Sequence, residues 1–285
     1  MNEKKLCLVT GASGGIGRAI SQELARAGYT VILQGRDLDK LIEIREELRH
    51  NSHIVLGDLT NEKNRTRILN ESFEYGDIEL LVNNAGISCF SSFTDSDKAA
   101  LVDLMEVNLL SPMLFTHEFL SRLTITNLNK QKVNEFNATV INVGSAFGSI
   151  GYPGFSLYCA SKFGLRGFSE SLSRELADSN IRVAYFAPRA TNTNINSVKV
   201  DDMNKALGNA SDSPEFVAKQ FMVLLNSKKS RKFVGWPEKV FSRLNGAFPE
   251  VVDKAIGSKL NKIKRFINQD KNEKPILNVS LVEEK

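Results

Sequence analysis

The sequence predicts an α/β fold in which helices cover both faces of a doubly wound parallel sheet. Short apolar runs rich in Val, Ile and Leu recur without strict polar alternation, which is typical of strands buried on both faces. Stretches in which apolar residues recur at helical spacing separate these runs, and that alternation is typical of a parallel sheet. The length of 285 residues suits one large α/β domain.

The positions of the strands and helices follow from this alternation of apolar runs and helical stretches. The strands are expected at 6–9, 30–34, 53–56, 79–82, 139–143, 182–186 and 232–235. Helices are expected over 16–27, 37–49, 61–73 and 95–120. The stretch 191–213 is polar, lacks a clear period and follows the sixth strand, so we expect a mobile loop over the ligand-binding end of the sheet.

Composition excludes several protein classes. Hydrophobic residues make up 42% of the chain and charged residues 25%, unlike a disordered chain, a collagen or a disulfide scaffold. Cys7, Cys89 and Cys159 lie far apart and only three histidines occur, so we predict no metal site and a reducing compartment. With no apolar run of about 18 residues and no room for a signal peptide before the first strand, a cytoplasmic protein is expected.

A glycine-rich turn lies between the first predicted strand and the first helix. Residues 10–17 read T-G-x-x-x-G-x-G, with Gly11, Gly15 and Gly17 at the glycine positions. Such glycines let the backbone approach a pyrophosphate, whose charge is stabilised at a helix N-terminus. The turn therefore predicts dinucleotide binding, with an ordinary glycine-rich turn as the alternative.

The end of the second predicted strand indicates which dinucleotide binds. The strand ends at Gly35 and Arg36 follows, where a carboxylate would favour NAD and an arginine accommodates the 2′-phosphate of NADP. Asp37 stands at the distance expected for the carboxylate, but it is better placed as the N-cap of the next helix. NADPH is therefore the favoured cofactor, with NAD as the alternative.

Tyr158 and Lys162 form a candidate proton donor. Four residues apart on a helix, they share one face. An ammonium group near a phenol lowers the pKa of the phenol from its usual value of about 10. The spacing thus makes Tyr158 a candidate general acid, although a single Tyr-xxx-Lys pair also arises by chance.

Several motifs in this order resemble the short-chain dehydrogenase/reductase family. They are the turn at 10–17, Asp58-Leu59-Thr60, Asn83-Asn84-Ala85-Gly86, Asn108, Ser145 and the Tyr158/Lys162 pair. The resemblance covers about residues 5–236 and implies one Rossmann-type domain with about seven parallel strands. It also implies a homo-oligomer, dimer or tetramer, formed through the long helices.

The resemblance also implies the site. Tyr158 would donate a proton to a substrate carbonyl, Lys162 would lower the Tyr158 pKa and hold the nicotinamide ribose, Ser145 would bind the substrate oxygen, and Asn108 would anchor a relay water. Outside this set, Ser145 and Asn108 would be read as caps or core polar groups. The residues implied to contact the cofactor are Gly11, Ser13, Gly15, Ile16, Gly17, Arg36, Asp58, Leu59, Asn84, Ala85, Gly86, Tyr158, Lys162, Pro188, Thr191 and Thr193.

The chain departs from the family pattern at two positions. Arg189 replaces the glycine that usually follows Pro188, and we expect it to add positive charge to the pocket and to favour an acidic or phosphate-bearing substrate. Gly144 stands where a serine often precedes the catalytic serine, and we expect little effect from it.

Residues 237–285 form a C-terminal extension beyond the domain at 1–236. Between residues 228 and 271 the chain has 12 Lys or Arg against 4 Asp or Glu, although the whole chain carries only +4. Apolar residues recur among them at helical spacing, and Pro237 and Pro249 are expected to interrupt the helix. Such a basic amphipathic segment binds a membrane surface, packs on its own body or contacts a partner subunit; nucleic acid is not expected.

Together these features predict an NADPH-dependent oxidoreductase that interconverts a carbonyl and a primary or secondary alcohol on a small, hydrophobic, lipid-like substrate. Aromatic residues between Ser145 and Tyr158 support an apolar substrate. The alternatives are a dinucleotide-binding regulatory protein on the same fold and a membrane-surface adaptor that acts through the extension. The predicted location is the cytoplasm, and peripheral association with the inner face of a membrane is the alternative.

Overall fold

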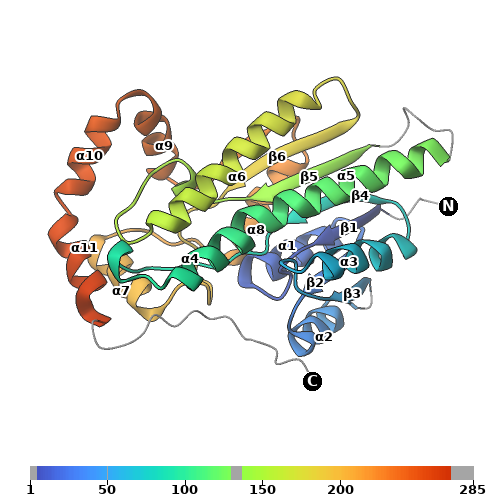
Figure 1. Ribbon diagram of the computed structural model, residues 1–285, viewed down its shortest axis with the longest axis horizontal. Helices are drawn as coiled ribbons and strands as arrows, with labels where there is room; N and C mark the ends of the chain where they lie inside the picture. The colour runs from blue at the N-terminus through green and yellow to red at the C-terminus, as the bar shows by residue number, and fades with distance from the viewer. Residues whose placement is uncertain (1–4, 50, 130–136, 271–285) are drawn as a thin grey trace.

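A seven-stranded parallel sheet forms the centre of the computed structural model, which describes residues 5–49, 51–129 and 137–270 (Figure 1). Its strand order is β3-β2-β1-β4-β5-β6-β7. The strands are β1 Lys5–Val9, β2 Tyr29–Gly35, β3 Ser52–Leu56, β4 Ile78–Asn83, β5 Ala138–Val143, β6 Ile181–Ala187 and β7 Arg231–Phe233. The predicted Rossmann-type sheet is confirmed, with each strand within two residues of its expected bounds.

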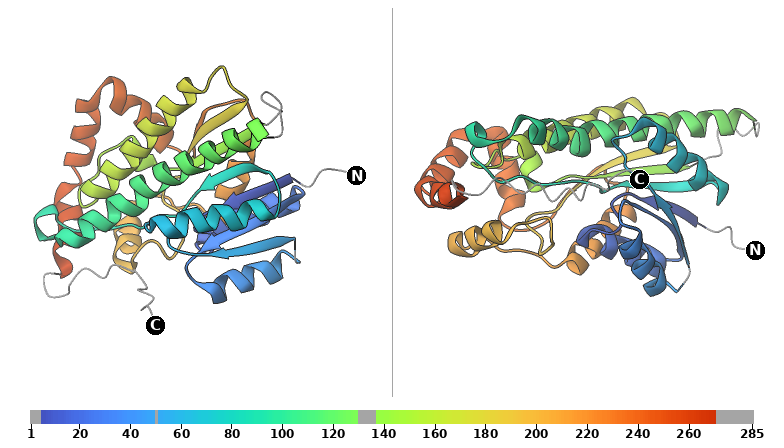
Figure 2. Two further views of the ribbon diagram at one scale, coloured as in Figure 1. Left: turned by 45° about the vertical axis from the view of Figure 1, so that its right-hand side comes forward. Right: turned by 60° about the horizontal axis from the view of Figure 1, so that its bottom comes forward.

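The helices lie on both faces of this sheet (Figure 2). They are α1 Gly15–Arg26, α2 Leu38–Glu47, α3 Glu62–Glu74, α4 Lys98–Met105, α5 Ser111–Asn129, α6 Ser156–Glu175, α7 Val198–Leu207, α8 Pro214–Leu225, α9 Glu238–Ala247, α10 Pro249–Gly257 and α11 Leu260–Ile267. Along β1, Cys7 and Val9 pack with α1, α2 and α8, whereas Leu6 and Leu8 pack with α3 and α5. Successive side chains of a strand point to opposite faces of the sheet, so alternate residues of β1 pack into two separate cores.

The helix expected over 95–120 is longer and is interrupted. It starts at Lys98, passes through a π-helical turn at Glu106–Leu110 and continues to Asn129 as α5. Its segment Lys98–Thr124 is long and apolar enough to span a membrane by length and composition, contrary to our expectation that no such helix exists. Phe115, Phe119 and Leu123 of this helix lie in the core against the sheet, which accounts for its apolar character.

The loop expected over 191–213 contains a helix. Helix α7 begins after Ser197, whose side chain accepts a hydrogen bond from the Val200 N–H, and ends at Gly208 in the left-handed conformation. Thr191 and Asp212 form a parallel bridge that joins the two ends of the stretch. The prediction of an unstructured loop was therefore wrong, because caps and tertiary contacts hold a helix whose sequence has little apolar periodicity.

The C-terminal extension consists of α9, α10 and α11 as far as it is described, and residues 271–285 lie outside the described part. Helices begin directly after Pro237 and at Pro249, as expected. Ile263 of α11 is fully buried in a cluster with Val200 and Met203 of α7, so part of the apolar stripe packs on the body of the same chain. This contact supports our proposal that 237–285 is an extension of the domain at 1–236 rather than a second domain.

Candidate active site

Two turns at the carboxyl ends of β1 and β4 form the base of the site. The Thr10 hydroxyl accepts hydrogen bonds from the N–H groups of Asn84 (3.0 Å) and Ala85 (3.1 Å). In return, the Asn84 side-chain amide donates to the carbonyls of Thr10 and Gly11, both at 3.1 Å. The strand order reverses between these neighbours, which is where ligands bind in open α/β sheets.

The glycines of the first turn are required by close packing. Gly11 has φ of 60°, and a Cβ there would lie 2.7 Å from the Ala85 Cα. A Cβ on Gly17 would overlap the Gly11 carbonyl and lie 2.6 Å from the Asn84 amide nitrogen. A larger residue at either position would separate the two turns.

The N-terminus of α1 fits the pyrophosphate of a dinucleotide. Within the described chain, its N-cap, Gly14, supplies no side-chain hydrogen bond, and the first turn has no acidic residue. In contrast, side chains of Asp37, Asn61, Ser197 and Ser213 cap α2, α3, α7 and α8. The first N–H groups of α1 therefore keep their capacity for an anion.

Basic and hydroxyl groups lie at the end of β2. Arg36 Nη1 is 3.5 Å from Asp58 Oδ2, and a Cβ on Gly35 would lie 3.4 Å from Ser13 Oγ. A guanidinium and a hydroxyl at the same end of a strand are suitable donors for the 2′-phosphate of NADP. Asp37 caps α2 by accepting from the Lys40 N–H at 3.2 Å, which confirms the N-cap prediction and leaves Arg36 as the first charged group beyond the strand.

The predicted catalytic residues lie together at the carboxyl ends of β4 and β5. The Asn108 side chain, in the π-helical turn, accepts from the Ile87 N–H at 2.8 Å and donates to the Ile87 carbonyl at 2.9 Å. A Cβ on Gly86 would lie 3.1 Å from Asn108 Oδ1 and 3.6 Å from Lys162 Nζ. Asn108 thus holds the loop after β4 in place, and its role in a water relay stays a prediction.

Ser145 follows β5 and faces Tyr158. The Ser145 hydroxyl accepts from the Phe147 N–H at 3.1 Å, which caps the short 3₁₀ turn Ala146–Gly148, and its side chain also hydrogen-bonds the Tyr158 phenol. Lys162 Nζ lies 5.8 Å from the centre of the Tyr158 ring and donates to the Val143 carbonyl at 3.3 Å. The three side chains converge on one point at the end of β5.

Burial dominates the electrostatics of this pair. It raises the pKa of Tyr158 to about 12, against the opposing effect of the Ser145 hydrogen bond. It lowers the pKa of Lys162 to about 8. We expected Lys162 to lower the Tyr158 pKa, but burial of the phenol has the largest effect on this pKa and raises it instead. The Tyr158 phenol is therefore protonated at neutral pH and can act as an acid.

Arg189 does not add free charge to the pocket. Its guanidinium donates to both carboxylate oxygens of Asp212, at 2.7 and 2.9 Å, and to the Trp236 carbonyl at 2.7 Å. Both members of the ion pair are largely buried. The expectation that Arg189 adds positive charge to the pocket was therefore wrong, because Asp212 neutralises its guanidinium within the fold, and Arg189 no longer supports an acidic or phosphate-bearing substrate.

The remaining residues predicted to contact the cofactor differ in their packing and in their hydrogen bonds. Leu59 packs in the core of Leu6 and Leu8, whereas Ile16 packs against the other core, that of Cys7 and Val9, so both side chains are part of the apolar packing. The Pro188 carbonyl accepts from the Ala146 N–H at 2.8 Å. The Thr191 hydroxyl donates to the Arg189 carbonyl at 3.0 Å, and Thr193 lies over the glycine-rich turn, where a Cβ on Gly15 would come within 2.6 Å of its methyl group.

Sequence reasoning missed two residues that shape the site. One is Thr10, whose hydroxyl joins the two turns. The other is Gln34, which is buried and accepts from the Gly11 N–H at 3.3 Å while donating to the Gly57 carbonyl at 2.7 Å. A buried glutamine in an otherwise apolar strand was the available signal, since such an amide needs partners.

Comparisons with known proteins agree with this geometry. The model of the family described as short chain dehydrogenase matches residues 5–204. The chain belongs to the short-chain dehydrogenase family. It is 32% identical over 228 residues to carbonyl reductase family member 4 of Xenopus laevis, covering 78% of this chain and 92% of the relative. It is also 32% identical over 204 residues to a 3-oxoacyl-(acyl-carrier-protein) reductase of Haemophilus influenzae, covering 71% and 81%.

A solved structure extends the match along the chain. A short-chain dehydrogenase from Streptomyces avermitilis superimposes with a TM-score of 0.75 at 26% identity, covering 93% of this chain and 98% of that one. As a short-chain dehydrogenase, the chain is an NAD(P)-dependent oxidoreductase that acts on carbonyl or CH–OH groups. The family resemblance drawn from the ordered motifs is confirmed.

Proposed function

We propose that the chain is an NADPH-dependent reductase of an apolar carbonyl substrate, working reversibly as an alcohol dehydrogenase. The observation that carries the proposal is the convergence of Ser145, Tyr158 and Lys162 beside an uncapped α1 N-terminus. This set supports both carbonyl chemistry and dinucleotide binding. NADPH is favoured over NADH because Arg36 follows the last residue of β2 and the Ser13 hydroxyl lies close to that residue, Gly35.

The side chains divide the chemistry between them. Ser145 and Tyr158 hydroxyls hold the substrate oxygen, and Tyr158 gives its proton to that oxygen as it becomes an alkoxide. The cofactor supplies the hydride that forms the new C–H bond at the carbonyl carbon. Lys162, which is cationic at neutral pH, stabilises the phenolate that Tyr158 leaves behind and offers an ammonium donor to a ribose hydroxyl.

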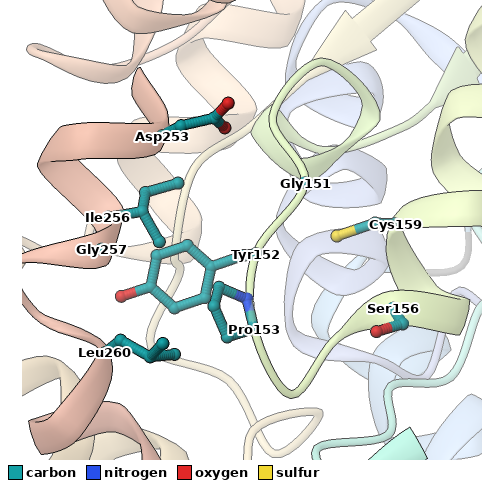
Figure 3. Close-up of a pocket in the computed structure, with 9 residues that line it drawn as sticks. All are labelled: Gly151, Tyr152, Pro153, Ser156, Cys159, Asp253, Ile256, Gly257 and Leu260. Carbon is teal, nitrogen blue, oxygen red and sulfur yellow. The ribbon is translucent and has the colours of Figure 1, made fainter. Parts of the chain in front are cut away.

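The surroundings of Tyr158 support an apolar substrate. Phe147 and Phe155 meet its ring edge-on, with centroids 6.4 and 6.1 Å away. Next to them, a cleft of about 430 Å³ opens between the loop before α6 and helices α10 and α11 (Figure 3). Its apolar wall includes Tyr152, Ile256 and Leu260, together with Cys159, the neighbour of Tyr158 on α6, and its polar members are Ser156 and Asp253. An acyl or other hydrocarbon chain suits this lining.

Replacing Tyr158 by phenylalanine tests the proton donor. We expect Tyr158→Phe to lower kcat by at least about a hundredfold, because the general acid is lost. NADPH affinity, read from nicotinamide fluorescence, should stay within about twofold, because the ring remains. NADPH oxidation with a panel of apolar ketones and 3-oxoacyl thioesters measures the rate, and Tyr75→Phe on the exposed surface is the control.

Native turnover in Tyr158→Phe would contradict the assignment. A wild-type protein that binds NADPH but reduces none of these carbonyls would instead favour the alternative of a dinucleotide-binding regulatory protein.

Replacing Arg36 tests the cofactor preference. We expect Arg36→Ala to weaken NADPH binding about tenfold or more, because a charge-assisted contact to the 2′-phosphate is lost, and to leave NADH binding unchanged. Parallel fluorescence titrations with both nucleotides measure this difference. Arg174→Ala, a mostly exposed arginine on α6, is the matched control. Equal affinity of the wild-type protein for NADH and NADPH would contradict the proposed preference for NADPH.

We also propose that two or more copies associate through α4, α5 and α6. These helices are neighbours (Figure 1). Val102 on α4, Leu114 on α5, Phe163 on α6 and Leu110 in the π-helical turn between α4 and α5 are exposed apolar residues. An apolar surface of this kind is typical of a protein interface. We expect Leu114→Glu to lower the mass of the particle measured by light scattering. Val223→Glu, on α8 at the opposite face of the sheet, should not change it. A monomeric wild type would overturn the proposal.

A second partner, an anionic membrane surface, is favoured by the start of the extension. Trp236 is 70% exposed and stands between basic residues. Burial, and then the ammonium groups of Lys239 and Lys229, lower the pKa of Lys232, so these three side chains form one cationic cluster. Phe248 and Val251, at the junction of α9 and α10, are also exposed. Exposed aromatic and basic side chains together suit the interface of an anionic bilayer.

Vesicle pelleting of the full chain tests this contact. We expect co-sedimentation with phosphatidylserine vesicles that weakens with added salt, and none with phosphatidylcholine vesicles. Phe248→Ser should weaken it, whereas Phe93→Ser should not, because both phenylalanines are 61% exposed but Phe93 lies outside the extension. Pelleting that is equal for the two lipids, or absent for both, would contradict the proposal.

A further inference from the structure

The main chain of Ser145 is held by a side chain from the neighbouring strand. Tyr185, on β6, is almost fully buried, and its hydroxyl accepts from the Ser145 N–H and donates to the Ser145 carbonyl, both at 3.2 Å. The Lys162 carbonyl lies 3.5 Å from the same hydroxyl and is a second, longer acceptor. One phenol thus contacts the main chain of two of the three residues that converge at the site.

The hydrogen bonds around Ser145 show why this phenol is needed. The N–H groups on either side, at Gly144 and Ala146, donate to the main-chain carbonyls of Phe186 (2.7 Å) and Pro188 (2.8 Å). The Ser145 N–H between them donates to the Tyr185 hydroxyl instead. The Ser145 backbone is extended, with φ of −160° and ψ of 160°, so its orientation is set by these contacts.

Two glycines make room for the phenol. A Cβ on Gly144 would overlap the Tyr185 ring, and a Cβ on Gly148 would overlap its hydroxyl. Both glycines have ordinary negative or extended backbone angles, so space rather than conformation requires them. The expectation that Gly144 has little effect was therefore wrong: glycine at 144 and at 148 and tyrosine at 185 form one interlocking unit.

We propose that Tyr185 is a positioning residue that aims the Ser145 hydroxyl at the substrate oxygen. The proposal rests on the carbonyl-reductase function proposed above. The Ser145 hydroxyl is bonded to the Phe147 N–H and to Tyr158, so rotation of the Ser145 main chain would move it off Tyr158. The hydroxyl of Tyr185 prevents that rotation from both the N–H and the carbonyl side.

Loss of this hydroxyl tests the proposal. Tyr185→Phe keeps the ring that fills the space beside Gly144 and removes the two hydrogen bonds to Ser145 and the longer contact with the Lys162 carbonyl. We expect kcat for NADPH oxidation with an acetoacetyl thioester to fall about tenfold, the equivalent of one or two hydrogen bonds. KM and NADPH affinity should stay within about twofold, because neither ligand is bound by Tyr185. Tyr29→Phe, at the opposite end of the sheet from the site, is the control.

Combining Tyr185→Phe with Ser145→Ala distinguishes a positioning role of Tyr185 from a general effect on the stability of the fold. In Ser145→Ala, the hydroxyl that Tyr185 aims is gone, so adding Tyr185→Phe should change kcat less than about twofold. The same tenfold loss in that background, or native kcat in Tyr185→Phe alone, would overturn the proposal. Gly144→Ala should also lower kcat, whereas Gly167→Ala, where a Cβ would meet nothing within 4 Å, should not.

Hydrogen exchange gives a readout that does not depend on turnover. Exchange in the segment 144–149 should rise in Tyr185→Phe and not in Tyr29→Phe, since the Ser145 N–H loses its acceptor. Unchanged exchange would overturn the proposal even if no substrate were found. A wild type that lacks reductase activity but shows this exchange difference would contradict the proposed function and keep the contact.

Discussion

The site depends on the reciprocal hydrogen bonds between the turns that follow β1 and β4. The Thr10 hydroxyl accepts hydrogen bonds from two N–H groups of the second turn, and the Asn84 side-chain amide donates hydrogen bonds to two carbonyls of the first turn. These contacts set the distance between the glycine-rich turn and Gly86, which lies against Asn108 and Lys162. The proposed cofactor-binding turn and the proposed catalytic residues are thereby fixed to one another.

A buried polar network continues this rigidity beneath the catalytic residues. The Asn83 amide donates to Thr116 of α5 and to Asn142 of β5, each at 2.8 Å, and Asn142 donates to Ser169 of α6 at 2.8 Å. Such a network specifies one arrangement of strands and helices because each buried polar atom loses energy without its partner. Helix α6, which carries Tyr158 and Lys162, is therefore held to the sheet by directional contacts as well as by apolar packing.

Local patterns predicted the sheet, most helices and the proximity of Ser145, Tyr158 and Lys162, but not the interactions that depend on packing. Apolar runs and the spacing of Tyr158 and Lys162 are visible in the sequence. The rise of the Tyr158 pKa is not, because it depends on how much of the phenol the fold buries. Ser197 and Gly208 were readable caps for α7, yet the weak apolar period between them hid the helix. The contact of Tyr185 with Ser145 joins residues forty positions apart and has no local signature.

The fate of Arg189 shows how the C-terminal extension is tied to the site. In place of a glycine, this arginine binds Asp212, which stands just before α8, and the Trp236 carbonyl at the start of the extension. Gly235 is required beside it, since a Cβ there would overlap the Arg189 side chain. Breaking a buried ion pair by removing one partner costs about 3–5 kcal/mol, so the Arg189–Asp212 pair holds the loop after β6 to the segment before α8. The charge that could have selected an acidic substrate is instead paired with Asp212, and the cluster that α11 completes around Phe155 and Cys159 is apolar.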